Sequence, residues 1–241
     1  MNLLALTSFG IENLLADEIK SLGGNNIVVK PEGVYFSAEL ETAYHICLWT
    51  RLASRILLEL SDNDVETKED IYSAAKDINW GKLFVPSKTF AIDFVGKNKD
   101  IRNTQFGALL IKDAIIDQFS QKGMGRPNVD KYAAQIRFQA RLLKGKLKIY
   151  LDFSGRSLFQ RGYRSSTGAA PLKENLAAAL VIRSGWLSDT SKPFVDPMCG
   201  SGTILIEAVS MAANYAPGID RQKWGFDYWL GHEDELWQSE L

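Results

Sequence analysis

The sequence has little cysteine, little histidine and no long apolar run. Its 241 residues include two cysteines and two histidines, too few for a disulfide framework or for the spacing of a zinc site. Because disulfides are rare in reducing compartments, this composition is typical of a cytoplasmic protein. No apolar stretch approaches the roughly 20 residues that cross a bilayer, and the apolar start of the chain lacks the basic residues of a signal peptide. We therefore expect a protein with no metal site and no membrane association.

Charge is distributed unevenly along the chain, although the formal net charge is only -1. Residues 61–192 contain 22 basic and 14 acidic side chains, whereas residues 1–60 contain 4 and 7, and residues 193–241 contain 2 and 8. A cationic middle segment is what a protein needs to bind the phosphates of a nucleic acid. Solvated protein surfaces can carry the same imbalance, so charge alone leaves both interpretations open.

The first 60 residues have the pattern of a small α+β domain. Apolar side chains recur with strand or helix period in successive segments, which are residues 3–7, 11–22, 27–30, 34–37, 40–52 and 56–60. The periods predict the order β-α-β-β-α-β, which is the ferredoxin-like arrangement. We therefore predict a ferredoxin-like domain over residues 1–60.

A second α+β unit is expected over residues 61–155. A helix near residues 68–78 and a strand near 89–95 precede a loop with several cations, Gly96–Asn103. A long amphipathic helix follows and ends at a cluster of glycine and proline over residues 123–128. Alternating side chains on both sides of Lys144-Gly145-Lys146 then predict a β-hairpin.

The most specific motif is the stretch from Phe194 to Thr203, which reads FVDPMCGSGT. Its apolar start predicts a strand over Phe194–Asp196, and an amphipathic helix is expected to follow the motif. Gly200 and Gly202 have no Cβ, so the backbone can turn sharply there and approach a ligand closely. The unpaired N–H groups and positive dipole end of the helix favour an anionic group such as a methionine carboxylate. The strand would end where ligands of open α/β sheets bind.

Other interpretations of this loop fit less well. A dinucleotide fingerprint needs a third glycine, and a nucleotide P-loop needs Gly-Lys followed by Ser or Thr; neither pattern occurs here. A strand-turn-helix corner that contains two glycines and binds nothing is the remaining alternative. The octet DPMCGSGT is more specific than a bare Gly-x-Gly and therefore favours a cofactor loop. The residues expected to bind the cofactor are Asp196, Pro197, Met198, Cys199, Gly200, Ser201, Gly202 and Thr203.

Cys199 has two interpretations. A thiolate at a helix N-terminus has a lowered pKa and is nucleophilic, whereas a small apolar side chain can pack under the turn. No base lies near it in the sequence, so packing is favoured. His45 and His232 have no partners at metal or catalytic spacing, and we expect them to be ordinary helix or surface residues.

Several stretches carry a resemblance to known families. Residues 61–155 resemble a THUMP domain, an RNA-binding module of RNA-modifying enzymes, and DPMCGSGT resembles the first motif of the N6-adenine/N2-guanine methyltransferases. Further stretches extend the resemblance along the chain: WTRLASR at Trp49–Arg55, DFSG at Asp152–Gly155 and RGYR at Arg161–Arg164. Together they are similar to the bacterial 23S ribosomal RNA guanine-N2-methyltransferases.

The resemblance implies methyl transfer from S-adenosyl-L-methionine to the exocyclic amine of a guanine in 23S ribosomal RNA. It also implies an α+β fold: a ferredoxin-like domain over residues 1–60, a THUMP domain over 61–155, a basic connector over 156–175, and the incomplete start of a Rossmann-like methyltransferase domain over 176–241. The Asn-Pro-Pro-Tyr motif with which such enzymes hold the target base does not occur. No catalytic residue is therefore assigned, and we expect the chain alone to be inactive.

Binding of 23S ribosomal RNA is the role that remains for the chain itself. Lys and Arg supply most phosphate contacts, and aromatic rings stack on unpaired bases. Each lysine is also compatible with a solvated surface, and the aromatic residues with packing between domains. The residues expected to contact RNA are Lys97, Lys99, Arg102, Lys122, Arg126, Arg156, Phe159, Arg161, Tyr163 and Arg164. The alternative function is a stand-alone RNA-binding or scaffold module that binds no cofactor.

Overall fold

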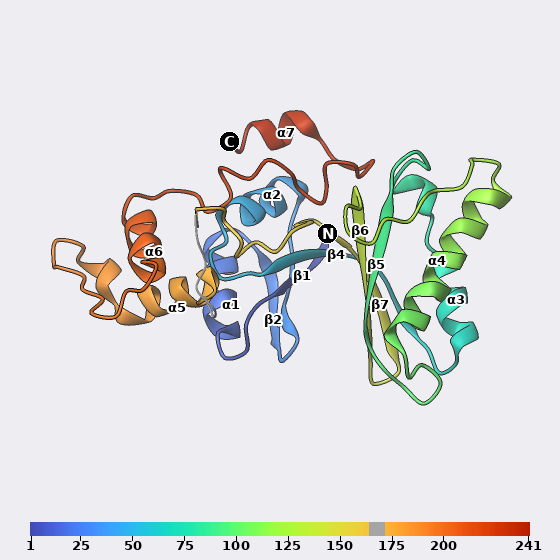
Figure 1. The fold of residues 1–241 in the computed structure, drawn as a ribbon, viewed down its shortest axis with the longest axis horizontal. Coiled ribbons are helices and arrows are strands. Elements are labelled where there is room, and N and C mark those ends of the chain that lie inside the picture. The colour runs from blue at the N-terminus through green and yellow to red at the C-terminus, as the bar shows by residue number, and fades with distance from the viewer. Residues whose placement is uncertain (164–171) are drawn as a thin grey trace. The chain divides into compact units, whose positions relative to one another are not determined.

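The computed structural model describes residues 1–163 and 172–241, so Arg164 and most of the second half of the expected connector lie outside the described residues. The chain forms two compact units (Figure 1). The first comprises Met1–Ile56, Arg156–Gln222 and Asp234–Leu241, and the second comprises Leu57–Gly155 and Lys223–Glu233. None of the described helices is long and apolar enough to cross a membrane.

The N-terminal part of the first unit has the predicted ferredoxin-like order. Its elements are β1 (Asn2–Leu6), α1 (Glu12–Ser21), β2 (Asn25–Lys30), β3 (Gly33–Ser37), α2 (Leu40–Trp49) and the start of β4 (Arg55–Asp64). Strand β3 pairs antiparallel with both β1 and β2. Leu15 and Ile19 on the inner face of α1, Leu4 of β1 and Ile46 of α2 are fully buried, and they form the core that holds these elements together.

The first unit continues with helices from the C-terminal third of the chain. They are α5 (Glu174–Ser184), η2 (Trp186–Ser188), α6 (Thr203–Ala212) and α7 (Asp234–Gln238). Helix α5 packs on α6. Helix α7 packs on α2 through Trp237 and Tyr44, whose ring centroids are 5.6 Å apart in an edge-on contact. These contacts join the C-terminal helices to the ferredoxin-like core.

The strand predicted over Phe194–Asp196 is not present, and this prediction is wrong. These residues have no regular secondary structure, and Val195 is 77% exposed. A parallel strand is stabilised by the neighbours on either side, and no described strand pairs with this segment. The sequence therefore has the pattern of a buried strand without the partners that such a strand needs.

The second unit is a four-stranded mixed sheet covered by helices on one face. Its elements are the rest of β4, α3 (Lys68–Lys76), η1 (Trp80–Lys82), β5 (Phe90–Gly96), α4 (Thr104–Gln121), β6 (Ile136–Leu143) and β7 (Lys146–Asp152). The strand order is β4-β7-β6-β5. The predicted β6–β7 hairpin is confirmed, and β5 pairs with β6 in parallel. Figure 1 shows α3 and α4 on the same face of this sheet.

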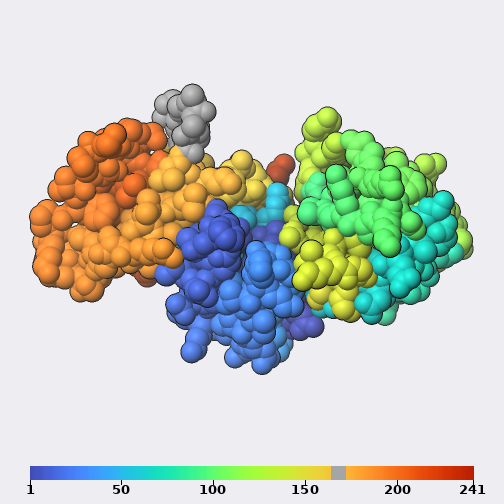
Figure 2. All heavy atoms as spheres, turned by 90° about the horizontal axis from the view of Figure 1, so that it is seen from below, coloured from blue at the N-terminus to red at the C-terminus, as the bar shows by residue number. Residues whose placement is uncertain are grey.

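Aromatic side chains fill the space between the helices and the sheet of the second unit. Phe84 lies at the centre, with its ring centroid 5.1 Å from that of Phe119 on α4 and 5.7 Å from that of Phe138 on β6. Trp80 packs edge-on against Phe138 at 4.9 Å and donates its indole N–H to the Ala75 carbonyl at 2.7 Å. The buried polar atom of Trp80 is thus satisfied, as a packed core requires. Figure 2 shows the atoms of residues 57–155, coloured from cyan to yellow, as one continuous body.

Residues 223–233 belong to the second unit although they follow α6 in the sequence. The Gly225 N–H donates to the Phe153 carbonyl at 2.9 Å. The rings of Phe226 and Trp229 lie 5.6 and 5.3 Å from that of Phe153, and the Lys88 Nζ lies 4.5 Å from the centroid of the Tyr228 ring. A tail segment expected to belong to the methyltransferase fragment therefore completes the core of the second unit.

We expect Gly225→Ala to destabilise the second unit by about 2 kcal/mol, because a Cβ there overpacks the turn. An added Cβ would lie 1.9 Å from the Asp152 carbonyl oxygen and 2.6 Å from the Gly155 nitrogen. Gly81→Ala is the matched control, since the nearest atoms to its Cβ would be those of the flexible Met124 side chain at 3.2 Å and the Asn79 side-chain oxygen at 3.8 Å. Hydrogen exchange of β7 peptides measures the effect; equal protection in the two variants would contradict it.

Candidate functional site

The predicted cofactor loop is an exposed turn that leads into α6. The Asp196 carboxylate accepts the Met198 N–H at 3.1 Å, and the Gly202 N–H donates to the Cys199 carbonyl at 2.7 Å. Gly202 is the N-cap residue of α6 and has φ +75°, while Gly200 has φ +53°. This left-handed backbone favours glycine at both positions. The pattern of glycines is therefore explained by the turn itself.

The surface of this turn is open to a ligand. A Cβ added at Gly200 or Gly202 would meet no atom within 4 Å, and the Met198 side chain is 91% exposed. The Ser201 and Thr203 hydroxyls lie 3.2 Å apart at the start of the helix. These residues fit the methionine end of S-adenosylmethionine, whose carboxylate is suited to a helix N-terminus. Cys199 is exposed and not packed under the turn, so the packing interpretation of this thiol is wrong.

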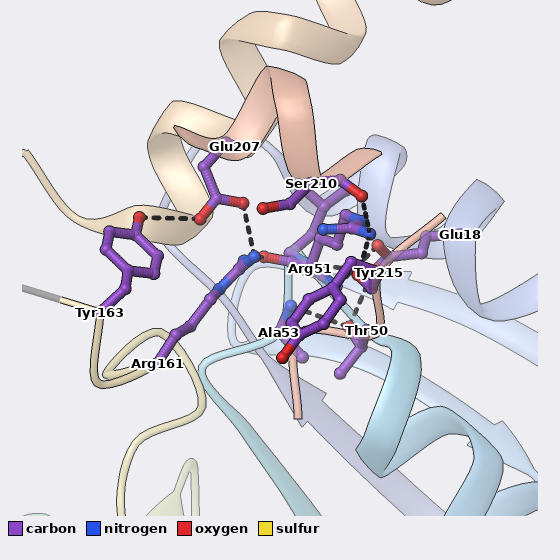
Figure 3. A network of polar contacts seen from close by, with 10 residues as sticks. Glu18, Thr50, Arg51, Ala53, Arg161, Tyr163, Glu207, Ser210 and Tyr215 are labelled. Atoms are coloured by element: carbon purple, nitrogen blue, oxygen red, sulfur yellow. Dashed lines mark hydrogen bonds and ion pairs between the residues drawn. The ribbon is translucent and has the colours of Figure 1, made fainter. Parts of the chain in front are cut away.

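A buried carboxylate on α6 lies one turn beyond the loop. Glu207 is fully buried, and its carboxylate accepts a hydrogen bond from Arg161 Nη1 at 2.5 Å and one from the Tyr163 hydroxyl at 2.8 Å (Figure 3). The side chains of Arg161 and Glu207 are 5% and 1% exposed. Since a charge this deeply buried is costly without a partner, Arg161 fixes where the first half of α6 can lie.

Arg51 holds the other end of the same helix. Its Nη2 donates to the Ser210 carbonyl at 3.3 Å and to the Tyr215 carbonyl at 2.6 Å (Figure 3). Arg161 Nη2 in turn donates to the Arg51 carbonyl at 2.7 Å. The last carbonyls of a helix have no partner within the helix, so Arg51 supplies part of what α6 lacks. The two arginines tie α6 to the segment that follows α2.

Glu18 of α1 fixes the backbone from which Arg51 extends. Its carboxylate accepts hydrogen bonds from the Thr50 hydroxyl at 2.7 Å, the Arg51 N–H at 2.8 Å and the Leu52 N–H at 3.2 Å (Figure 3). The centre of the WTRLASR stretch is thus held by Glu18, a half-buried acidic residue of α1. We call the residues Glu18, Thr50, Arg51, Arg161, Tyr163 and Glu207 the α6 network.

Burial sets the electrostatics of the α6 network. It raises the pKa of Glu207, against the opposing effects of Arg161 and of the Tyr163 hydrogen bond. It also raises the pKa of Glu18 and lowers that of Arg51. For Tyr163, burial and the neighbouring Glu207 raise the pKa of the phenol, which therefore stays protonated and donates. The hydrogen bonds of the network therefore act as a structural tie between α6 and the segment that follows α2.

The connector residues that are expected to contact RNA differ in how exposed their side chains are. Arg161 and Tyr163 belong to the α6 network, where both side chains bind the Glu207 carboxylate, and their contacts with phosphate and base stay predictions. Phe159 is half-buried, with the Lys173 Nζ 5.3 Å from its ring centroid. Arg156 is exposed, and of this group it remains the clearest candidate for a phosphate contact.

The predicted RNA contacts of the second unit are all exposed, and they form two groups. Lys97, Lys99 and Arg102 lie in the loop between β5 and α4, whereas Lys122 and Arg126 follow α4. Helix α4 has 18 residues, which separates the groups by about 27 Å. The first loop is ordered by Asn98, whose side-chain oxygen accepts the Asp100 and Ile101 N–H groups at 3.0 and 2.7 Å. These cations are therefore held apart at the two ends of one helix.

The fold places further exposed cations beside each of the two groups at the ends of α4, and the sequence pattern did not predict them. Lys144 is exposed in the β6–β7 turn, and the parallel pairing that ends at Gly96 and Leu142 places this turn beside the Lys97 loop. Lys131 and Tyr132 are exposed near the start of β5, because Phe90 pairs with Val129. The only sequence signal for Lys144 is its place in a hairpin turn. Parallel pairing between distant strands has no local signature.

Three family models match successive parts of the chain. They are the RlmL ferredoxin-like domain over residues 2–57, the THUMP domain over residues 65–152, and the RMKL-like methyltransferase domain over residues 161–240. The chain therefore contains, in this order, segments that match an RlmL-type ferredoxin-like domain, a THUMP domain and an RMKL-like methyltransferase domain. The predicted fold class is confirmed.

Two curated relatives match nearly the whole of this chain. The chain is similar to ribosomal RNA large subunit methyltransferase K/L of Colwellia psychrerythraea, with 65% identity over 238 residues, which is 99% of this chain and 33% of the relative. It is 50% identical to the protein of the same name from Pseudoalteromonas atlantica, over 99% of this chain and 34% of the relative. The chain thus spans about a third of the length of the relatives that it matches.

Solved structures show the same arrangement of elements. A predicted N6-adenine-specific DNA methylase from Listeria monocytogenes superposes with a TM-score of 0.87 and 29% identity, over 99% of this chain and 62% of that chain. SMU.472, a putative methyltransferase complexed with SAH, superposes with a TM-score of 0.85 and 32% identity over the same shares. The fold is therefore shared with these two proteins, and this chain covers 62% of each of them.

Proposed function

We propose that this chain is the RNA-docking portion of an S-adenosylmethionine-dependent 23S ribosomal RNA (guanine-N2) methyltransferase of the cytoplasm. The observation that carries the proposal is the pair of exposed cationic groups at the two ends of α4, on a THUMP domain. Its relatives' name supports a ribosomal RNA substrate. The chain spans about a third of the length of these relatives, and under this proposal the rest of the catalytic domain lies in the part that it does not cover.

The residues of the chain divide into two roles under this proposal. The cations at the ends of α4 position RNA through its phosphates, which sets orientation without reading sequence. The loop Asp196–Thr203 holds the methionine end of S-adenosylmethionine, and the cofactor supplies the methyl group for the guanine amine. The α6 network keeps the helix behind that loop in place. No residue of the chain is assigned a part in the chemical step.

A second candidate is an RNA-binding module that uses no cofactor. The exposure of Val195 and Met198, and the lack of a strand before the loop, favour it. A cofactor site needs several walls to bury most of its ligand, whereas this loop supplies one. The two candidates share RNA binding and differ only in the affinity for S-adenosylmethionine.

We expect the chain to bind a structured 23S ribosomal RNA fragment with steep salt dependence. If the five exposed cations at the ends of α4 each meet a phosphate, the slope of log affinity against log salt is about -4. Fluorescence anisotropy between 50 and 200 mM salt measures it as roughly a hundredfold or greater loss. Undetectable or salt-independent binding would contradict the proposal. Calorimetric titration with S-adenosylmethionine separates the two candidates, since saturable binding excludes the second.

A further inference from the structure

A groove of about 540 Å³ lies in the second unit between the edge strand β5 and helix α4. The strand wall is Phe90–Val95, and the helix wall carries Ala108, Leu109 and Lys112. Leu109 is 48% exposed, so the apolar part of the helix wall is open to solvent. An open apolar surface commonly marks a binding site.

The outer edge of β5 faces this groove. In the strand order of the sheet β5 is the last strand, and its inner edge pairs with β6. Backbone groups point to alternate edges along a strand, so those of Ile92 and Phe94 point outward as those of Phe90 do. Among the described residues, Ile92 and Phe94 make no backbone hydrogen bond at this outer edge. Each of the two residues therefore offers a donor and an acceptor.

The chain itself shows how this edge holds an extended segment. Residues 128–130 lie along the start of β5, where the Phe90 N–H donates to the Asn128 carbonyl at 3.0 Å and the Phe90 carbonyl accepts the Asp130 N–H at 3.1 Å. An added peptide strand makes the same pair of bonds with each outward-facing residue. Beyond this segment the edge runs from Ile92 to Gly96, which is about 13 Å, or about four residues of extended peptide. The row of bonds begun at Phe90 can therefore continue with a second segment.

Helix α4 adds a side-chain pocket to the strand edge. A residue paired directly opposite Ile92 or Phe94 points its side chain to the same face of the sheet as they do. That face is the one covered by α4, because a Cβ added at Gly107 would lie 2.7 Å from the Phe94 ring. Alternate side chains of an added strand would therefore enter the space beside Ala108 and Leu109. Apolar side chains at every second position fit these walls.

Lysine side chains make one end of the groove cationic. Lys131 is exposed and lines the groove near the start of β5. Helix α4 connects the parallel strands β5 and β6, so it runs back along the sheet and carries Lys112 toward the same end. The Lys112 Nζ lies 2.7 Å from the Asp113 carboxylate, a surface contact that contributes little in water. Asp93 in the strand wall lies 3.6 Å from Arg137, whose charge offsets it. An acidic group of the ligand is therefore favoured at this end.

We propose that the β5–α4 groove binds a short extended segment of a partner protein, which adds to β5 as an antiparallel strand. Its main chain bonds with Ile92 and Phe94, and two alternate apolar side chains lie beside Ala108 and Leu109. Antiparallel pairing is the more stable of the two directions, and it places the C-terminal end of the segment at the start of β5. An acidic residue there meets Lys131. This partner goes beyond the proposed function, which needs only RNA and the cofactor.

The main-chain contacts are tested with the whole chain and a pair of peptides, by fluorescence anisotropy. The first is fluorescein-Gly-Thr-Val-Thr-Val-Glu-amide, whose two valines face the groove while its threonines face solvent. The second carries N-methyl groups on both valine nitrogens, so it keeps every side chain and charge and loses the donors that face β5. We expect the N-methyl peptide to bind at least about tenfold more weakly. Equal affinities, or no saturable binding of the first peptide, would overturn the proposal.

The pocket and the charge are tested with variants of the chain. Ala108→Trp fills the groove and should weaken binding of the first peptide about tenfold, as loss of a well-packed anchor does. Lys131→Glu should weaken it about fivefold, and a peptide with Lys in place of its Glu should recover the loss. Lys82→Glu, an exposed lysine on η1 of the same unit, is the matched control and should bind as the wild type does. If circular dichroism shows that Ala108→Trp is unfolded, the N-methyl comparison on the wild type decides.

Three further results identify the occupant. Shifts of the Ile92 and Phe94 amide resonances with the first peptide are expected. Shifts with a single-stranded tetraribonucleotide but not with the peptide would overturn the proposal, as would self-association of the wild type that Ala108→Trp abolishes, because the groove would then hold RNA or a second copy. The proposed function is tested separately by binding of the 23S fragment, so either conclusion can fail while the other stands.

Discussion

Arg161→Met should lower the stability of the first unit by about 3 to 5 kcal/mol, because it leaves the Glu207 carboxylate buried without its cation. Arg161 also donates to the Arg51 carbonyl, so the variant loosens the link between α6 and the segment after α2. Hydrogen exchange of peptides from α6 and from residues 44–56 measures the loss locally. A local readout is needed because a chain of two units need not unfold in one step.

The double variant Arg161→Met with Glu207→Met is the control for this experiment. Replacing both partners of a buried ion pair by apolar side chains of similar size is often neutral or stabilising, so most of the lost protection should return. Tyr163→Phe removes only one hydrogen bond to the same carboxylate and should cost about 1 kcal/mol. If Arg161→Met costs no more than Tyr163→Phe, Glu207 is not held as a charged group.

Reversing the charges of Lys97, Lys99 and Arg102 together should reduce affinity for a structured 23S fragment by at least about a hundredfold at low salt. Three phosphate contacts are lost, and each also contributes about 0.9 to the salt slope. The slope should therefore fall by nearly 3 relative to the wild type. Anisotropy titrations at several salt concentrations measure both quantities in one series. All three side chains are exposed, so the fold is expected to survive.

A matched triple reversal distinguishes a local contact from a change in overall charge. Lys20, Lys30 and Arg183 are exposed residues of the first unit, and changing them to Glu alters the net charge by the same amount. We expect this control to lose less than about fivefold, because exposed charges beyond a Debye length are screened. Equal losses in the two variants would show that only net charge matters, and would remove the loop before α4 from the RNA interface.

Local pattern was sufficient to predict most of the fold. The helices and strands of the ferredoxin-like domain, the β6–β7 hairpin and the start of α6 follow from apolar spacing, turn residues and the glycine motif. The parallel pairing of β5 with β6 did not follow, because the two strands are joined through a helix and no local residue encodes their register. The place of Lys144 and Lys131 relative to the predicted cations depends on that pairing.

Arg161 and the Phe194–Asp196 segment show how distant parts of the chain determine local structure. Arg161 lies in a basic stretch and was expected to meet phosphate, but Glu207, which is 46 residues away in the sequence, buries it. The Phe194–Asp196 segment has strand-forming side chains, yet it forms no strand without neighbours. In both cases the local sequence pattern is interpreted correctly, but a distant segment determines the structure. Glu207 pairs with Arg161, whereas no described strand pairs with Phe194–Asp196.

The division of the chain into units has a consequence for how the protein can be dissected. The polypeptide passes from one unit to the other after Ile56, Gly155, Gln222 and Glu233. A fragment cut at residues 57–155 would contain β5, β6, β7 and all but the first two residues of β4, but it would lack Trp229, which packs on Phe153. Neither unit is a removable module, so truncation boundaries drawn from domain limits alone would yield fragments with incomplete cores.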